Sequence, residues 1–200
     1  YGLTDKTKVS IETLAGIKYI DMEVQDGKMK TAKVNMGSPI LCPSEIPVTI
    51  GEKQCVNEPL IVEGKEYHVT AVSMGNPHAV MFIDEHPKDF DLEKYGKACE
   101  GNTNIFPDRV NAEFAKIIDR NNIEMRVYER GSGETLACGT GSCATAVAAI
   151  TLGLCDNDVT IHLLGGDLEI SWSGDVNDSV FMTGPAKEVF TGEVDLNKFD

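Results

Sequence analysis

The segment 139–152 constrains the fold most strongly, because it is the one long stretch with a helical pattern and consists largely of small residues. Gly153 follows it and is the residue type that most often terminates a helix. The other regular segments mostly alternate apolar and polar residues, which is typical of strands. Many strands with one long helix argue against a doubly wound nucleotide-binding fold, which needs strands and helices in alternation. We therefore expect an α+β fold in which a strand-rich sheet wraps around a central helix.

Short turns rich in glycine and aspartate separate the predicted strands. Asp26-Gly27 is a strong hairpin signal, and Gly64-Lys65 is a second one. A shorter helical pattern covers 89–99, and the proline-containing stretch 37–47 is a candidate domain boundary. The predicted strands are 9–13, 17–24, 29–36, 60–63, 67–74, 78–84, 109–118, 123–128, 159–163, 168–172, 180–183 and 187–190.

The charge balance limits the classes of partner. The 200 residues include 18 Lys and Arg against 32 Asp and Glu, which gives a formal net charge of −14. Such a chain is repelled by phosphate backbones and by anionic membrane surfaces. No stretch reaches the ~18 apolar residues of a spanning helix, and no basic segment precedes an apolar leader. We expect no nucleic-acid partner and no membrane association.

The six cysteines are expected to be free thiols. No two have the spacing of zinc knuckles or thioredoxin-like sites, and the four histidines show no metal-ligand spacing. A chain of this length can bury a core without disulfides. These features predict a reducing, cytoplasmic location and no metal.

The most informative segment surrounds Cys138, which directly precedes Gly139-Thr140-Gly141 at the start of the predicted helix. The first amides of a helix are unpaired and carry partial positive charge, so they can bind a carboxylate and lower the pKa of a nearby thiol. One interpretation is a reactive thiol beside an anion pocket formed by Gly139 and Thr140. The alternative is that the glycines only permit a tight turn and close packing. Cys143, further along the helix, is expected to be a core residue.

A second candidate is Gly75-Asn76-Pro77-His78. Proline restricts the residue before it to extended geometry, so Asn76 would be held rigidly at the entrance of a strand. Its amide could hold a polar group of a substrate, or the segment is an ordinary Asn-Pro turn. His78 could be a general base or a structural hydrogen-bonding residue.

Two further polar positions interrupt strand patterns. Glu129-Arg130 ends a strand before Gly131, and Arg130 could clamp a carboxylate with two hydrogen bonds. The alternative is a solvated surface pair, which contributes little. Asn111 lies in the apolar segment 110–114 and is either an edge position or a ligand.

Taken together, four segments resemble the diaminopimelate epimerase family. They are Met-Gly-Asn-Pro-His-Ala-Val at 74–80, Val-Asn-Ala-Glu-Phe at 110–114, the segment 129–141 that contains Cys138, and Met-Thr-Gly-Pro-Ala at 182–186. The similarity covers nearly the whole chain, and the part around Cys138 is the most specific. The resemblance implies two similar α+β halves, each wrapped around a central helix, with the active site in the cleft.

The resemblance also implies a domain division. Residues 1–47 would be the remainder of an N-terminal epimerase domain, 48–190 the C-terminal epimerase domain, and 191–200 a tail that returns to the first domain.

By the same resemblance, the activity is a cofactor-independent epimerisation of LL-diaminopimelate to the meso isomer, which serves lysine and peptidoglycan synthesis. Two cysteines face the α-carbon from opposite sides; one removes the α-proton and the other delivers a proton. Cys138 would be one of them, and His78 would orient or tune a catalytic thiol. Gly139 and Thr140 would hold the α-carboxylate. The residues expected to recognise the other polar groups of this amino-acid substrate are Asn76, Asn111, Glu129 and Arg130. The sequence leaves open whether the protein forms a homodimer.

The sequence departs from the family in one respect. The family carries its other catalytic cysteine in a Cys-Gly-Asn-Gly segment, which is absent here, and residues 1–4 resemble the stretch that follows it. None of Cys42, Cys55, Cys99 and Cys155 has an equivalent context. We therefore expect an N-terminally truncated fragment that does not epimerise alone.

Three alternatives stay open. A proline racemase-like enzyme would share the Cys-Gly-Thr-Gly core but lacks the lead-in seen at 129–135. A non-catalytic small-molecule-binding module could have kept the anion pocket. A thiol hydrolase would need a Cys–His pair and an oxyanion site, for which His78 is available.

Overall fold

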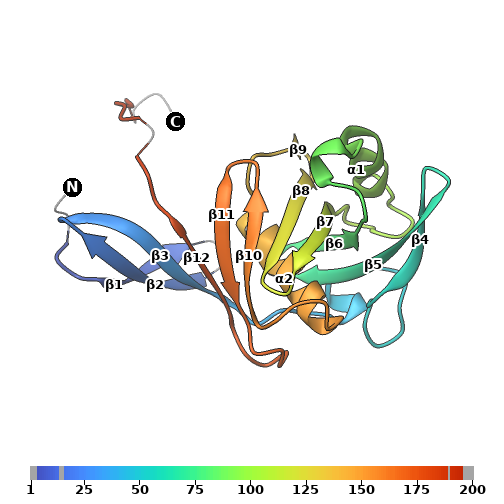
Figure 1. Cartoon of the computed structure of the whole chain (residues 1–200), viewed down its shortest axis with the longest axis horizontal. Helices are drawn as coiled ribbons and strands as arrows, with labels where there is room; N and C mark the ends of the chain where they lie inside the picture. Colours follow the sequence, from blue (N-terminus) through green and yellow to red (C-terminus); the bar gives the residue numbers. More distant parts are fainter. Residues whose placement is uncertain (1–3, 14–15, 189, 196–200) are drawn as a thin grey trace.

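The computed structural model of the protein describes residues 4–13, 16–188 and 190–195. In this part of the chain, strands predominate and two α-helices and two short 3-10 turns complete the regular structure (Figure 1). The helices are α1 (Leu92–Glu100) and α2 (Gly139–Thr151), and the 3-10 turns are η1 (Pro43–Glu45) and η2 (Pro87–Asp89). The strands are β1 (Lys8–Thr13), β2 (Gly16–Gln25), β3 (Lys28–Gly37), β4 (Glu58–Val62), β5 (Lys65–Ser73), β6 (Pro77–Phe82), β7 (Asn111–Asp119), β8 (Asn122–Glu129), β9 (Gly133–Glu134), β10 (Asp158–Leu163), β11 (Gly166–Ser171) and β12 (Val180–Pro185). The expected strand-rich α+β fold is confirmed.

The described strands form one twelve-stranded mixed sheet. Its order is β1-β2-β3-β12-β11-β10-β8-β7-β6-β5-β4, and β9 pairs with β8. The pairs β6–β7 and β8–β10 are parallel, and the other neighbours are antiparallel. Helix α1 connects β6 to β7, and helix α2 lies between β8 and β10 in the chain. Each parallel pair therefore has the crossover connection that parallel neighbours need.

Helix α2 is the central helix that the sequence predicts. It contacts β5, β6, β7, β10, β11 and β12, and lies among the strands near the middle of the molecule (Figure 1). Every residue from Gly141 to Ala149 is buried, which small side chains permit because the helix backbone can approach the sheet closely. Helix α1 packs against β4, β7, β8 and β9. Val80 and Val127 belong to the apolar cluster around α2, whereas Met81 and Phe114 belong to the cluster around α1.

Strand register brings the polar candidates together. His78 of β6 pairs with Asn111 of β7 in the parallel register. Because side chains alternate between faces along a strand, Glu113 lies on the same face of β7 as Asn111. On the other side of β7, Tyr128 of β8 pairs with Ala112, so Glu129 ends the neighbouring strand close by.

One predicted strand is absent from the described residues, and one predicted helix begins later than expected. Residues 187, 188 and 190 are not in a strand, and residue 189 lies outside the described residues. Strand β12 instead runs to Pro185, which has no N–H to donate to a further ladder bond. The helix predicted from residue 89 begins at Leu92, because the Asp91 side chain accepts a hydrogen bond from the Lys94 N–H and caps the helix there.

The proposed domain division stays a prediction. Strand β3 belongs to the segment 1–47, yet it pairs directly with β12 near the end of the chain. Within the predicted boundary, Ile40 forms an isolated bridge with Ser73 of β5. Residues 191–195 form no helix or strand, and the rest of the predicted tail lies outside the described residues.

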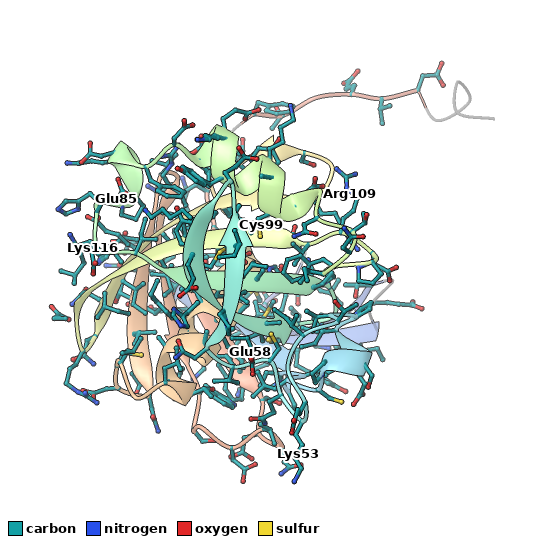
Figure 2. The ribbon with its side chains drawn as sticks, turned by 90° about the vertical axis from the view of Figure 1, so that its right-hand side faces the viewer. Lys53, Glu58, Glu85, Cys99, Arg109 and Lys116 are labelled. Atoms are coloured by element: carbon teal, nitrogen blue, oxygen red, sulfur yellow. The ribbon has the colours of Figure 1, made fainter. Side chains whose placement is uncertain are left out.

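Most charged side chains lie at the surface, and Glu100 and Glu113 are buried exceptions among the described residues. In Figure 2, Lys53 and Glu85 lie at the periphery, whereas Cys99 lies inside, between α1 and the sheet. Within the described residues, neither helix has the length and apolar character required to cross a membrane.

Candidate active site

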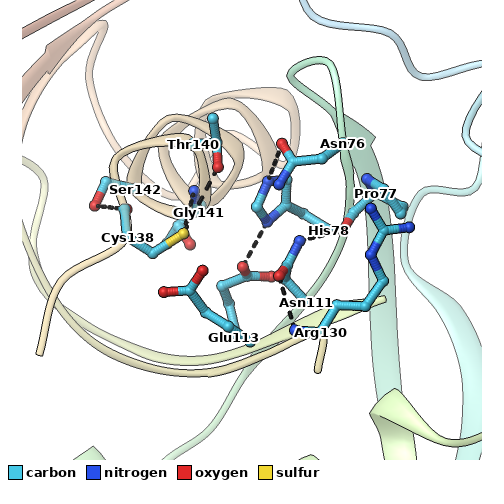
Figure 3. Close-up of polar contacts among 12 residues, drawn as sticks. Asn76, Pro77, His78, Asn111, Glu113, Arg130, Cys138, Thr140, Gly141 and Ser142 are labelled. Atoms are coloured by element: carbon cyan, nitrogen blue, oxygen red, sulfur yellow. Dashed lines mark hydrogen bonds and ion pairs between the residues drawn. The ribbon is translucent and has the colours of Figure 1, made fainter. Parts of the chain in front are cut away.

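Cys138 is the N-cap of helix α2. Its backbone is extended, with φ −135° and ψ 108°, and its sulfur accepts a hydrogen bond from the Gly141 N–H at 3.4 Å (Figure 3). The thiol also lies 3.6 Å from the Thr140 hydroxyl. The sulfur thus stands where a Ser or Asp oxygen usually caps a helix. The sequence placed the cysteine correctly at the start of the helix.

The predicted lowering of the Cys138 pKa is wrong for this state of the protein. Burial and the negative charge of Glu113 raise the pKa of the thiol to about 12, although the bonds to Thr140 and Gly141 act in the opposite direction. The side chain is only 7% exposed, so the thiolate loses most of its hydration. The helix N-terminus is present, but desolvation outweighs it, and Cys138 is a protonated thiol here.

Cys138 should nevertheless be alkylated by iodoacetamide faster than Cys143, because access separates the two thiols. Burial also raises the pKa of Cys143 to about 12, so their thiolate fractions are similar. Cys143, however, is 0% exposed and lies in the apolar cluster around α2. Peptide mass spectrometry after timed labelling at pH 8 measures both rates in one sample. Equal or reversed rates would contradict this burial argument.

His78 lies at the centre of a buried polar chain. Its Nδ1 atom is 2.6 Å from Oε1 of Glu113, and its Nε2 atom is 3.1 Å from Oδ1 of Asn76 (Figure 3). His78 and Glu113 are both 0% exposed. The turn at Asn76 therefore places the Asn76 side-chain amide against the His78 ring. The Cys–His pair of a thiol hydrolase is not formed among the described residues, because the contacts of both ring nitrogens are with these two side chains.

Glu113 is the site residue that sequence reasoning missed. It lies in the segment 110–114, from which only Asn111 was selected. The alternation of a strand was the available signal, because it places residues 111 and 113 on the same face. Burial raises the pKa of the Glu113 carboxyl, and the neighbouring His78 opposes that rise.

Asn111 is not an edge residue, and two hydrogen bonds hold its side-chain amide in place. Strand β7 lies between β6 and β8, so the edge interpretation is wrong. The side-chain amide donates to the Pro77 carbonyl at 2.8 Å and accepts from the Arg130 N–H at 3.0 Å. Asn111 therefore joins the turn that carries Asn76 to the loop that follows β8.

The loop after β8 holds Glu129 and Arg130. Glu129 is half-buried and accepts a hydrogen bond from the Thr135 hydroxyl at 2.5 Å, whereas Arg130 is exposed and donates to the Asp108 carbonyl at 3.0 Å. The buried Glu100 carboxylate also holds this loop, because it accepts a hydrogen bond from the Gly131 N–H at 3.0 Å. Glu100 forms an ion pair with Arg109 as well. Glu129 and Arg130 are thus held near the site but do not form an ion pair with each other among the described contacts.

Gly139 and Thr140 begin helix α2, and both are half-buried. As first-turn residues, their N–H groups have no partner within the helix, which suits a carboxylate. A Cβ atom on Gly139 would lie 3.1 Å from the Met182 sulfur. Glycine therefore allows the first turn to lie close to β12. Among the described residues, no group of three or more His, Cys, Asp or Glu could hold a metal ion.

Two solved structures have a similar fold. The chain superposes on a probable proline racemase from Agrobacterium radiobacter K84 with a TM-score of 0.71 and 15% identity, over 98% of this chain and 63% of that one. It superposes on a hydroxyproline epimerase from Agrobacterium vitis with a TM-score of 0.68 and 15% identity, over 91% of this chain and 58% of that one. The protein therefore has the α+β fold of these racemase and epimerase structures, with a thiol capping its central helix.

The sequence comparisons identify the family. A model of diaminopimelate epimerase matches residues 70–189. A diaminopimelate epimerase from Acetivibrio thermocellus is 52% identical over 98% of this chain, and one from Agathobacter rectalis is 50% identical over 97%. The chain belongs to the diaminopimelate epimerase family, and it spans 69% and 70% of the lengths of these two relatives.

Proposed function

We propose that this chain is the larger part of an enzyme that converts LL-diaminopimelate to the meso isomer, and that Cys138 is one of its two acid/base thiols. The observation that carries the proposal is the position of Cys138 as the N-cap of α2, beside the first-turn amides of Gly139 and Thr140. Family membership supplies the substrate. The reaction belongs to lysine and peptidoglycan synthesis.

The chemistry needs an acid and a base on opposite faces of the α-carbon. A thiolate removes the α-proton, and its sulfur becomes a thiol. The electron pair left on the α-carbon spreads onto the α-carboxylate, where fixed amides of a helix start stabilise the growing charge. A thiol on the other face then delivers its proton to the α-carbon and becomes a thiolate. No cofactor enters this balance.

The raised pKa of Cys138 supports the role of proton donor in one direction of the reaction. A thiol with a pKa of about 12 stays protonated at neutral pH, as the delivering group must be. In the reverse direction, Cys138 must act as the thiolate. The ammonium group of a bound amino acid would favour that form, because an opposite charge nearby lowers a thiol pKa.

The second thiol is proposed to lie outside these 200 residues. Cys55 and Cys99 belong to the apolar cluster around α1, and Cys143 and Cys155 belong to the cluster around α2. Cys42 is half-buried beside the Ser44 hydroxyl. These surroundings offer no partner thiol aimed at the substrate face of Cys138. We propose that the missing thiol belongs to a preceding segment, and that the 200 residues alone do not epimerise.

Deuterium exchange tests this proposal. The purified chain, and the same chain preceded by the N-terminal segment of the Acetivibrio thermocellus relative, are incubated with LL-diaminopimelate in D2O. Mass spectrometry follows deuterium at the α-carbon, and chiral chromatography follows the meso isomer. We expect exchange only with the extended protein. Robust meso-isomer formation by the 200 residues alone would overturn the missing-thiol proposal, and a folded but inactive extended protein would contradict the assigned activity.

A further inference from the structure

The Glu113–His78 pair is the most deeply buried pair of titratable side chains in the site. Both side chains are 0% exposed, and only 2.6 Å separates Oε1 of Glu113 from Nδ1 of His78. The other carboxylate oxygen, Oε2, is buried and has no hydrogen-bond partner among the described residues. Leaving a buried carboxylate oxygen without a partner is costly, so a role beyond packing is indicated.

Glu113 also lies directly under the first turn of helix α2. A Cβ atom on Gly141 would be 2.8 Å from Oε1 of Glu113 and 3.2 Å from the Cys138 sulfur. Because Gly141 has no side chain, the Glu113 carboxylate and the Cys138 thiol can both lie close to its Cα atom. The N-terminus of a helix stabilises negative charge, which favours the ionised form of Glu113.

The other titratable groups around Glu113 come from four elements. His78 approaches from β6 and opposes the rise in the Glu113 pKa, whereas the negative charge of Glu129, at the end of β8, adds to that rise. The charge of Glu113 raises the pKa of the Cys138 thiol, which caps α2, and that of the buried Cys99 thiol of α1. His78 is thus the one basic side chain that contacts this carboxylate among the described residues.

We infer that Glu113 is a positioning residue of the epimerisation site, which fixes the ring of His78 through an Nδ1–H bond and places its carboxylate beside the Cys138 thiol at Gly141. The inference rests on the proposed role of Cys138 as an acid/base thiol. The carboxylate acts through His78 and Cys138 and does not itself reach the reacting atoms. The fixed ring directs Nε2 toward Asn76, at the rigid turn before β6.

Glu113→Gln tests the charge, because glutamine keeps the shape of the side chain. Cys138 in the 200-residue protein should then react with iodoacetamide about tenfold faster at pH 8, since loss of one neighbouring negative charge lowers the thiol pKa by about one unit. Glu100→Gln is the matched control, because Glu100 is also a buried, ion-paired carboxylate but is not among the charges that act on Cys138. We expect Glu100→Gln to leave the Cys138 rate within twofold of the unmodified protein.

Cys143 reports on a loosened helix in the same experiment. It lies one turn further along α2 and is fully buried, so local opening would accelerate its alkylation together with that of Cys138. A selective increase at Cys138 supports the inference. An unchanged Cys138 rate, or equal acceleration of both thiols, would overturn it.

A second measurement needs no variant at position 113. Nitrogen-15 NMR of the unmodified protein should show His78 protonated at Nδ1, with a downfield proton resonance from the short bond to Glu113, and His78→Gln identifies that resonance. An unprotonated Nδ1 would overturn the inference even if Glu113→Gln fails to fold. The alkylation and NMR measurements use no substrate. An inactive extended protein would therefore contradict the proposed function, whereas the role of Glu113 is decided by these two measurements alone.

Discussion

Replacing Cys138 by serine in the extended enzyme should lower the rate of α-proton exchange by about 10²–10⁴-fold, the usual contribution of a general acid or base. Serine is a good N-cap residue, so its hydroxyl can accept the Gly141 N–H bond that the sulfur accepts now. The fold should therefore persist while the thiol chemistry is lost. Deuterium incorporation under saturating LL-diaminopimelate measures the loss, and circular dichroism verifies the fold.

Cys143→Ala is the control for this experiment. Cys143 belongs to the same helix, but its side chain is fully buried in the apolar cluster around α2. We expect Cys143→Ala to keep exchange within severalfold of the unmodified enzyme, at a modest cost in stability. If Cys138→Ser retained most of the exchange rate, or if the two variants lost it equally, the assignment of Cys138 as an acid/base thiol would be contradicted.

Phe114→Ala should give the largest loss of stability, about 3–5 kcal/mol in the free energy of unfolding, as is usual for removing a buried phenylalanine ring. Phe114 is 0% exposed and its ring lies 4.4 Å from that of Phe90 and 5.8 Å from that of Tyr67, centroid to centroid. Urea unfolding followed by circular dichroism measures the change. Phe114→Leu keeps most of the volume and should lose clearly less.

The location of this residue connects stability to the site. Phe114 follows Glu113 on β7 and points into the opposite cluster, so it anchors the strand that presents Asn111 and Glu113 to α2. We therefore expect the alkylation of Cys138 to become faster in Phe114→Ala even where the protein stays folded. A loss below about 1 kcal/mol would show that the aromatic cluster does not hold this strand in place.

The sequence predicts those parts of the fold that local pattern controls. Helix α2 was predicted at 139–152 and is observed at Gly139–Thr151, since its composition and the glycine after it define both ends. The Asp26-Gly27 hairpin is also observed, with positive φ at both turn residues, as that turn type requires. The strand predicted at 187–190 was wrong because an alternating pattern does not reveal whether a neighbouring strand is available.

The parts of the site that the sequence could not predict depend on contacts between distant segments. Cys138 was selected correctly, but its pKa depends on burial and on Glu113, 25 positions earlier in the chain. Asn111 was selected as a ligand or an edge residue, whereas its two hydrogen bonds to Pro77 and Arg130 depend on how β6, β7 and β8 lie together. The roles of Asn76, Asn111, Glu129, Arg130, Gly139 and Thr140 in substrate binding stay predictions.

The position of β12 has a consequence for synthesis on the ribosome. In the sheet, β1, β2 and β3 connect to the remaining strands through β12, which is the last of the described strands. The first three strands therefore emerge from the exit tunnel long before their partner, and at typical elongation rates they wait on the order of ten seconds. During that interval the β3 edge has unpaired backbone groups, and such an edge is prone to pair with the wrong strand. The nascent chain should accordingly need protection by chaperones until β12 has been translated.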